Sequence, residues 1–296
     1  MEQKYINLYD EYTHSNDINR RDFVDRLIKL AGSSALALAL LPSLENNQTK
    51  AQTVPKDDKN LETKYIEYQG ASGKMRGYLA MPKKVKGKIP AVVIIHENKG
   101  LQPHIEDVAR RAALAGFIAL APDALSQSGG TPADADKARE LIGKLDYPKT
   151  VGDFVAAVNY LQSYKNSNGN VGCVGFCWGG SMANQLAVNA ANLKAAVAFY
   201  GGQPKAEDVA KIKAAVQLHY AGLDERIDAG IPAYEAALKK NNVEYELYMY
   251  EGVNHAFHND TNEARYNAAA AKLAWQRTIK FLEEHLSEKK KDKKTK

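Results

Sequence analysis

The stretch of the chain best suited to chemistry is a glycine-rich turn around Cys177. A valine-rich run leads into Gly-Phe-Cys-Trp-Gly-Gly at residues 175–180, and a helix-like segment follows at 181–190. This Gly-x-Cys-x-Gly pattern predicts a nucleophile elbow, the sharp strand-to-helix turn that exposes a nucleophile, here with a thiol in place of serine. Side chains at Gly175 and Gly179 would collide with neighbouring backbone in such a turn. The alternative is a buried cysteine in a glycine-rich turn.

The first turn of the helix after Cys177 would also shape the chemistry of the sulfur. Unpaired N–H groups and the positive end of the helix dipole favour a thiolate and, later in a reaction, an oxyanion. The second cysteine, Cys173, lies four residues earlier on the same expected strand, roughly 13 Å away at strand rise. A disulfide needs Cα atoms closer than about 7 Å, so we expect Cys173 to be a core residue. The sequence shows no metal-binding constellation.

Two further side chains could complete a catalytic relay with Cys177. Asp224 follows one expected strand and His255 follows the next, which gives the chain order nucleophile, acid, histidine of the α/β-hydrolase triad. A neutral His255 would take the thiol proton, and Asp224 would fix the ring tautomer and stabilise the imidazolium. The alternatives are that Asp224 caps a helix and that His255 is a surface loop residue.

The other histidines fit the role of base less well. His96 directly precedes Glu97 at a strand end, and His219 lies inside an expected strand. His14, His104 and His285 are remote from strand ends in the required order.

Strand-like and helix-like segments alternate from residue 64 onward. Alternation of this kind predicts an α/β fold with a mostly parallel central sheet covered by helices on both faces, opened by a β-hairpin. Ligands of such sheets bind beyond the carboxyl ends of the strands. The expected strands are 65–68, 75–81, 89–96, 117–123, 171–176, 194–200, 214–219 and 244–250. The expected helices are 105–115, 150–164, 181–190, 231–240 and 268–285, with a polar loop at 126–135.

Composition is that of a globular protein with one large domain. The chain has 296 residues, 45% hydrophobic and 25% charged, with a net charge of +5. We place the domain at residues 61–286 and a disordered basic tail, with six lysines and two acids, at 287–296. Nucleic-acid binding is not expected, because no basic–aromatic interleaving or reader motif accompanies the tail.

Residues 1–60 have a different character and predict an export signal followed by a linker. Arg20 and Arg21, an aromatic residue at position 23 and an apolar run at 30–41 resemble a twin-arginine signal, which implies a periplasmic or otherwise exported protein. The run is too short to span a bilayer, so no stable membrane insertion is expected. The best cleavage site is Thr-Lys-Ala at 49–51. The alternative is an amphipathic helix on a cytoplasmic protein.

Four motifs resemble those of the dienelactone hydrolase family (carboxymethylenebutenolidase-like). They are the elbow, Gly-Leu-Asp ending at Asp224, Asn-His-Ala-Phe around His255, and His-Glu-Asn-Lys-Gly around Glu97. The resemblance covers roughly residues 64–286. It implies an α/β-hydrolase fold and hydrolysis of small esters or lactones through an acyl-thiol intermediate, without a cofactor. It also implies Cys177 as nucleophile, Asp224 as acid and His255 as base.

The resemblance implies roles for three more residues. Glu97 matches the family glutamate that contacts the resting cysteine and helps to generate the thiolate, and a carboxylate beside a thiol would share its proton. The alternative for Glu97 is a charge at a helix N-terminus. The backbone N–H groups of Trp178 and Asn98 would form the oxyanion hole.

The substrate pocket departs from the family pattern. An arginine that binds an anionic substrate should lie four residues after His255, where this chain has Asn259. Arg139 is the nearest candidate cation, and Tyr200 and Phe257 could line an apolar acyl pocket. We expect a monomer that acts on a small-molecule ester or lactone. A non-catalytic ligand-binding homologue and a cysteine acyltransferase or peptidase are the alternatives.

Overall fold

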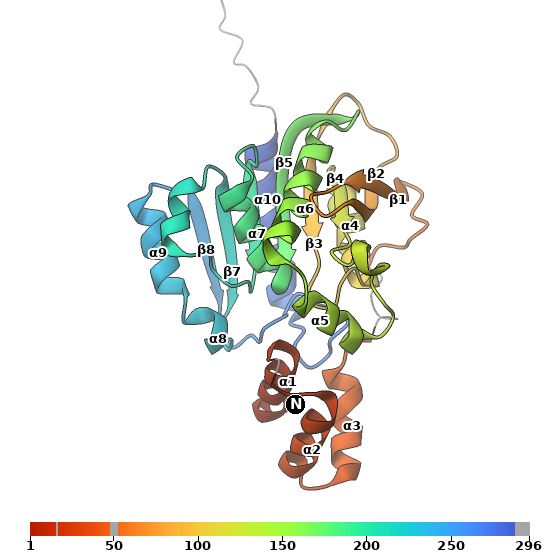
Figure 1. Ribbon diagram of the computed structural model, residues 1–296, viewed down its shortest axis with the longest axis vertical. Helices are drawn as coiled ribbons and strands as arrows, with labels where there is room; N and C mark the ends of the chain where they lie inside the picture. The colour runs from red at the N-terminus through yellow and green to blue at the C-terminus, as the bar shows by residue number, and fades with distance from the viewer. Residues whose placement is uncertain (16, 48–52, 288–296) are drawn as a thin grey trace, which may run out of the picture.

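The chain folds around one eight-stranded sheet in this computed structural model, which describes residues 1–15, 17–47 and 53–287 (Figure 1). The strands are β1 (Leu61–Gln69), β2 (Lys74–Pro82), β3 (Ile89–Ile95), β4 (Ile118–Pro122), β5 (Ser167–Phe176), β6 (Ala195–Phe199), β7 (Ala215–Ala221) and β8 (Tyr245–Tyr250). Their order is β1-β2-β4-β3-β5-β6-β7-β8. β2 is antiparallel to β1 and β4, and the other neighbouring pairs are parallel. The predicted hairpin and mostly parallel sheet are confirmed.

Helices cover both faces of the sheet because its central strands are apolar on both sides. In β3, Val92 and Ile94 pack into one apolar cluster, while Val93 and Ile95 pack into another, as the two-residue period of a strand requires. The first cluster includes α4 (Pro103–Leu114) and α10 (Ala268–Leu286). The second includes α6 (Tyr147–Gln162), α7 (Trp178–Asn189) and α9 (Ile231–Lys240). Each of these buried side chains contributes about 1.5–3 kcal/mol.

Residues 3–44 form three helices with a small apolar core of their own. They are α1 (Gln3–His14), α2 (Arg20–Ala31) and α3 (Ser34–Leu44), and we call them the N-terminal unit. Tyr9, Tyr12 and Phe23 lie at the centre of that core. Figure 1 shows the unit at the edge of the sheet where the parallel strands end. The expectation of a signal followed by a linker did not foresee this packed unit.

The apolar run at 30–41 is divided between two helices rather than forming one. Gly32 ends α2 with a φ of 80°, and the Ser33 side chain caps α3. No single helix in the described part of the chain has the length and hydropathy of a membrane span; α2 and α3 reach them only together, and they are bent by 118°. Export stays a prediction. The suggested cleavage site at 49–51 and the tail at 288–296 lie outside the described residues.

Two short helices were not expected from the sequence. α5 (Ala135–Gly143) begins after the polar loop, where the Asp134 side chain accepts hydrogen bonds from two backbone N–H groups. α8 (Glu225–Asp228) follows Asp224 directly. α5 matters for function, because it carries Arg139 to the cavity described below.

Candidate active site

The predicted nucleophile elbow lies between β5 and α7. Cys177 has φ 56° and ψ −116°, a conformation that costs a non-glycine residue about 1–3 kcal/mol. A Cβ on Gly175 would lie 1.8 Å from the carbonyl oxygen of Gly179, and one on Gly179 would lie 2.4 Å from that of Ile95. Glycine at these two positions therefore permits the turn, which presents Cys177 at the N-terminus of α7.

Asp224 and His255 are brought to Cys177 as predicted. They follow β7 and β8, whose carboxyl ends lie at the same edge of the sheet as the elbow. The Nδ1–H of His255 donates to Oδ2 of Asp224 at 2.5 Å, and the carboxylate, which only accepts, fixes that tautomer. A ring nitrogen of His255 and the sulfur of Cys177 lie within 4.8 Å of each other. Thiol, imidazole and carboxylate therefore form one cluster.

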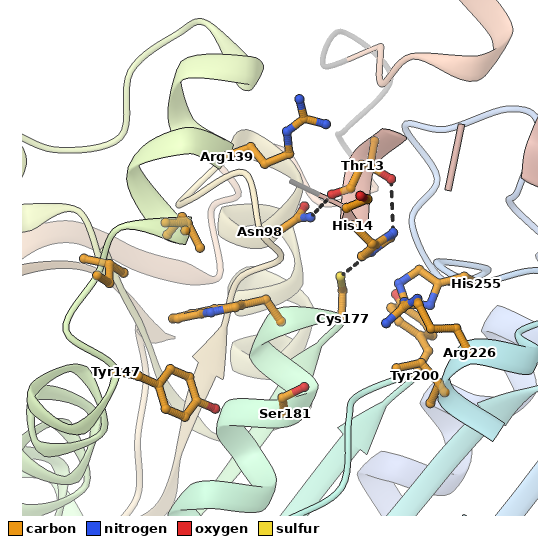
Figure 2. A pocket seen from close by; sticks show the side chains of 16 residues that line it. Thr13, His14, Asn98, Arg139, Tyr147, Cys177, Ser181, Tyr200, Arg226 and His255 are labelled. Atoms are coloured by element: carbon orange, nitrogen blue, oxygen red, sulfur yellow. Dashed lines mark hydrogen bonds between the residues drawn. The ribbon is translucent and has the colours of Figure 1, made fainter. Parts of the chain in front are cut away.

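A second histidine, which sequence reasoning set aside, contacts the sulfur more closely. Nε2 of His14, the last residue of α1, lies 3.2 Å from Sγ of Cys177. Its ring meets that of His255 edge-on, with centroids 4.6 Å apart. Figure 2 shows both rings beside Cys177, with His14 reaching it from the N-terminal unit. No local signal marked His14, because it belongs to a helix 163 residues before the cysteine.

The two imidazoles differ in charge. Burial lowers the pKa of His255, but the charges of Asp224 and Cys177 outweigh it and hold the pKa above its usual range. Nε2 of His255 has no hydrogen-bond partner among the described residues. Burial, followed by the nearby His255, holds the pKa of His14 well below its usual range. His14 is therefore neutral near pH 7, and His255 is the ring that takes up a proton.

Glu97 is buried close to this cluster, held by an unexpected partner. Its Oε2 accepts a hydrogen bond from Nδ2 of Asn259 at 2.7 Å, while its Oε1 has no partner in the described part of the chain. Asn259 stands where the family pattern has an arginine, and here it binds Glu97. Glu97 lines a small pocket together with Cys177 and His255. Its contact with the resting thiol stays a prediction, because among the described residues the sulfur's side-chain hydrogen bond is with His14.

Side-chain contacts anchor the two residues predicted to form the oxyanion hole. Trp178 is the first residue of α7, and its ring stacks on that of His96 at 5.2 Å. The side chain of Asn98 donates to the carbonyl oxygen of Thr13 in α1 at 2.8 Å. Both backbones are therefore held in place beside Cys177. That their N–H groups stabilise an oxyanion stays a prediction.

A cavity of about 430 Å³ opens over the sulfur. Its size suits a small molecule. Two of its wall residues, Arg139 from α5 and Arg226 from α8, carry positive charge, and no aspartate or glutamate of the described residues lines it. Figure 2 shows both arginines at its rim. The lining residues are Thr13, His14, Ser15, Asn98, Arg139, Ile142, Gly143, Leu145, Tyr147, Cys177, Trp178, Ser181, Tyr200, Arg226, Ile227 and His255.

Of the two aromatic residues predicted to line the pocket, one lines the cavity and the other lies in the core. Tyr200 lines the cavity, with its ring 4.9 Å from that of His255 and its hydroxyl buried without a hydrogen-bond partner among the described residues. Phe257 instead lies in the core, fully buried against Tyr200 and Tyr250, and does not line the cavity. The Phe257 ring therefore packs behind Tyr200 in the core instead of contacting a ligand in the cavity.

Comparisons with known proteins agree with this fold and with a hydrolase. The sequence profile described as "Dienelactone hydrolase family" matches residues 75–286. A Saccharolobus solfataricus protein named "Putative carboxymethylenebutenolidase" is 33% identical over 74% of this chain and 97% of its own length. A Bradyrhizobium protein named "Probable 2-oxo-3-(5-oxofuran-2-ylidene)propanoate lactonase" is 33% identical over 73% of this chain and 92% of its own.

Solved structures show the same architecture. The crystal structure titled "Putative Dienelactone Hydrolase" from Klebsiella pneumoniae superposes with a TM-score of 0.68 and 27% identity, over 75% of this chain and 98% of that one. The matched profile does not include α1 (Gln3–His14). Together with the elbow and the Asp224–His255 pair, the match over residues 75–286 shows that this chain belongs to the dienelactone hydrolase family and is a carboxylic-ester or lactone hydrolase with the α/β-hydrolase fold.

Proposed function

We propose that the chain hydrolyses small esters or lactones through a covalent acyl intermediate on Cys177. One observation carries the proposal: the sulfur lies within 4.8 Å of a ring nitrogen of His255, whose other nitrogen is held by Asp224. A nucleophile, a base and an orienting acid in this relation are the components of acyl transfer. The family membership and the small cavity over the sulfur support the same reaction class.

The proposed reaction has two balanced halves. His255 takes the thiol proton while Sγ attacks the acyl carbon and a C–S bond forms; the C–O bond to the leaving alcohol then breaks as His255 donates that proton to the leaving oxygen. Water then attacks the thioester carbon while His255 takes a proton from it, the C–S bond breaks, and His255 returns the proton to sulfur as the carboxylic acid leaves. In a lactone, the alcohol stays attached to the product. The reaction uses only groups of the chain and water.

Supporting residues keep the roles that the family resemblance implies. The N–H groups of Trp178 and Asn98 would stabilise the oxyanion, and removing such a donor costs about 10²–10³ in rate. Glu97, with one oxygen free of hydrogen bonds among the described residues, would help to generate the thiolate, as the family resemblance implies.

The charges of the cavity favour a substrate that carries a carboxylate. The side chain of Arg226 is half-exposed, and its NH2 lies as far as 3.9 Å from Oδ1 of Asp224. Its guanidinium can therefore still donate hydrogen bonds to a ligand. Arg139 is more engaged, since it donates to the carbonyl oxygen of Tyr12. A cavity with two guanidinium groups and no acidic wall residue among those that the structure describes attracts anions. The Bradyrhizobium relative is likewise named for a lactone that bears a carboxylate.

Substitution of the nucleophile tests the proposal. Cys177→Ala should abolish hydrolysis of p-nitrophenyl acetate while circular dichroism stays that of the wild type, and Cys173→Ala serves as the matched control because Cys173 is a buried core residue. An ester that carries a distal carboxylate should have a higher kcat/KM than the same ester without the carboxylate. Full activity of Cys177→Ala would remove the thiol mechanism. Wild-type protein inert toward a broad ester and lactone panel would favour a non-catalytic binding protein.

A further inference from the structure

His14 turns the cysteine and its base into a three-ligand cluster. One ligand atom from each of His14, Cys177 and His255 lies within 4.8 Å of the other two. Four-coordinate zinc binds nitrogen at about 2.0–2.1 Å and sulfur at about 2.3 Å, so the ligand atoms of one ion lie roughly 3.3–3.8 Å apart. The distance of 3.2 Å between His14 Nε2 and Cys177 Sγ is already near this range. A thiolate with two imidazoles favours zinc-like ions over magnesium or calcium.

Both imidazoles are oriented as metal ligands usually are. Nδ1 of His14 lies 2.9 Å from the carbonyl oxygen of Asp10, and Nδ1 of His255 lies 2.5 Å from the carboxylate of Asp224. Both oxygens only accept, so each ring, when neutral, carries its hydrogen on Nδ1 and presents an Nε2 lone pair. A backbone carbonyl and a carboxylate are the groups that commonly orient metal-bound histidines. Both rings therefore leave an Nε2 lone pair for a metal ion, and that of His14 already contacts the sulfur.

Burial and charge also suit a divalent ion. Nε2 of His255 belongs to a side chain that is 2% exposed, and it has no hydrogen-bond partner in the described part of the chain. An unsatisfied buried polar atom is costly, and a metal bond would satisfy it. The thiolate and Asp224 together carry two negative charges, which balance a divalent cation despite Arg226 nearby. All three residues line the cavity, so water in it would supply a fourth ligand, as in open zinc sites.

We propose that His14, Cys177 and His255 bind a zinc-type divalent cation, which inhibits hydrolysis by occupying both the nucleophile and its base. Binding forms one metal–sulfur and two metal–nitrogen bonds. The single proton that Cys177 and His255 hold between them leaves to solvent, and no electron is transferred. The binding claim needs only these three side chains, whereas the claim of inhibition rests on the proposed function.

Cobalt titration of the full-length reduced protein tests binding without reference to activity. Co²⁺ should produce the near-ultraviolet band of a thiolate ligand and the visible bands of tetrahedral coordination, and Zn²⁺ should displace it. His14→Gln, which keeps a polar side chain of similar length, should weaken affinity on the order of 100-fold, because the loss of even an orienting partner costs 10–100-fold. His285→Gln is the matched control, since His285 lies at the end of α10 and pairs with Glu244.

The outcomes separate the two proposals. Unchanged Co²⁺ affinity in His14→Gln, or in His14→Ala with wild-type circular dichroism, would overturn the three-ligand site. Zn²⁺ should inhibit ester hydrolysis reversibly, with EDTA restoring it, and should inhibit His14→Gln only at much higher concentration. Hydrolysis by a wild-type protein that shows no thiolate–Co²⁺ band would remove the metal site and leave the proposed function intact. A Co²⁺ band in a protein without hydrolytic activity would support the metal site and remove the proposed function.

Discussion

At the scale of the residue, one sulfur lies between two histidines of opposite character. Asp224 and the thiolate favour the charged form of His255, whereas burial keeps His14 neutral. Because the carbonyl oxygen of Asp10 accepts from Nδ1–H of His14, the lone pair of His14 Nε2 is left for Sγ, and a protonated Cys177 donates a hydrogen bond to it. That hydrogen bond stabilises the thiol form of Cys177, and in the proposed mechanism transfer of the proton from Cys177 to His255 forms the reactive thiolate.

The depressed pKa of His14 predicts how stability depends on pH. In the unfolded chain, His14 binds a proton below its usual pKa of about 6.5, whereas in the folded chain it stays neutral. His14 therefore lowers the stability of the fold as pH falls through that pKa. His255 acts in the opposite sense, because its raised pKa adds stability below about 6.5 that is lost only as pH rises through the higher folded value.

Urea unfolding of the wild type and His14→Gln between about pH 5 and 7.5 measures this difference. The stability of the wild type relative to the variant should decline toward the acid end of the range. Other buried neutral histidines, such as His219, are present in both proteins and cancel in the comparison. Parallel stability curves would contradict a neutral, buried His14.

At the scale of the element, α1 is the wall of the active site that the sequence did not reveal. Elements with strong periodicity, from β3 to α10, lie close to their expected positions, and the residues just after their strands meet at one edge because parallel strands end together. α1 has no such constraint. Its placement depends on long-range contacts, among them those of Thr13 with Asn98 and of Asp10 with Arg265.

Weakening one of these contacts should uncover the sulfur. The 4%-exposed Arg265 side chain pairs with Asp10 of α1 at 2.5 Å. Arg265→Ala removes this ion pair and leaves Asp10 without its partner. α1 should therefore open more often, and Cys177, which is 7% exposed in the closed form, should react faster with iodoacetamide. Arg26→Ala is the control, because Arg26 pairs with Glu11 of α1 from within the N-terminal unit and at an exposed position.

Mass spectrometry of the Cys177 peptide follows that reaction. Arg265→Ala should raise the alkylation rate severalfold, and Arg26→Ala should leave it near the wild-type value. Equal rates in all three proteins would show that α1 does not limit access to the sulfur.

At the scale of the whole molecule, the α/β-hydrolase domain was predictable and its N-terminal partner was not. Cys177, Asp224 and His255 carried motifs and stood at strand ends, so sequence alone brought them together. The role of residues 20–41 was read from two arginines and an apolar run, a pattern that a packed helix pair satisfies equally well. Phe257 was expected at the pocket and lies buried in the core, because a residue two positions after His255 can face either the pocket or the core.

Export and the N-terminal unit bear on each other. If a signal ending near residue 51 were removed, the mature enzyme would lose His14, the Thr13 contact with Asn98 and the proposed metal site. Export stays a proposal, and the intact mass of the protein from its native host decides whether the unit remains part of the working enzyme.

The central claim is that Cys177 forms a covalent acyl intermediate, and trapping that intermediate tests it most directly. The enzyme is mixed with a p-nitrophenyl ester, quenched in acid within the first turnovers and analysed by peptide mass spectrometry. The account predicts one added acyl group on the peptide that contains Cys177, and none on that peptide in Cys177→Ala. Steady turnover by the wild type without any acyl adduct, together with an active Cys177→Ala variant, would contradict it.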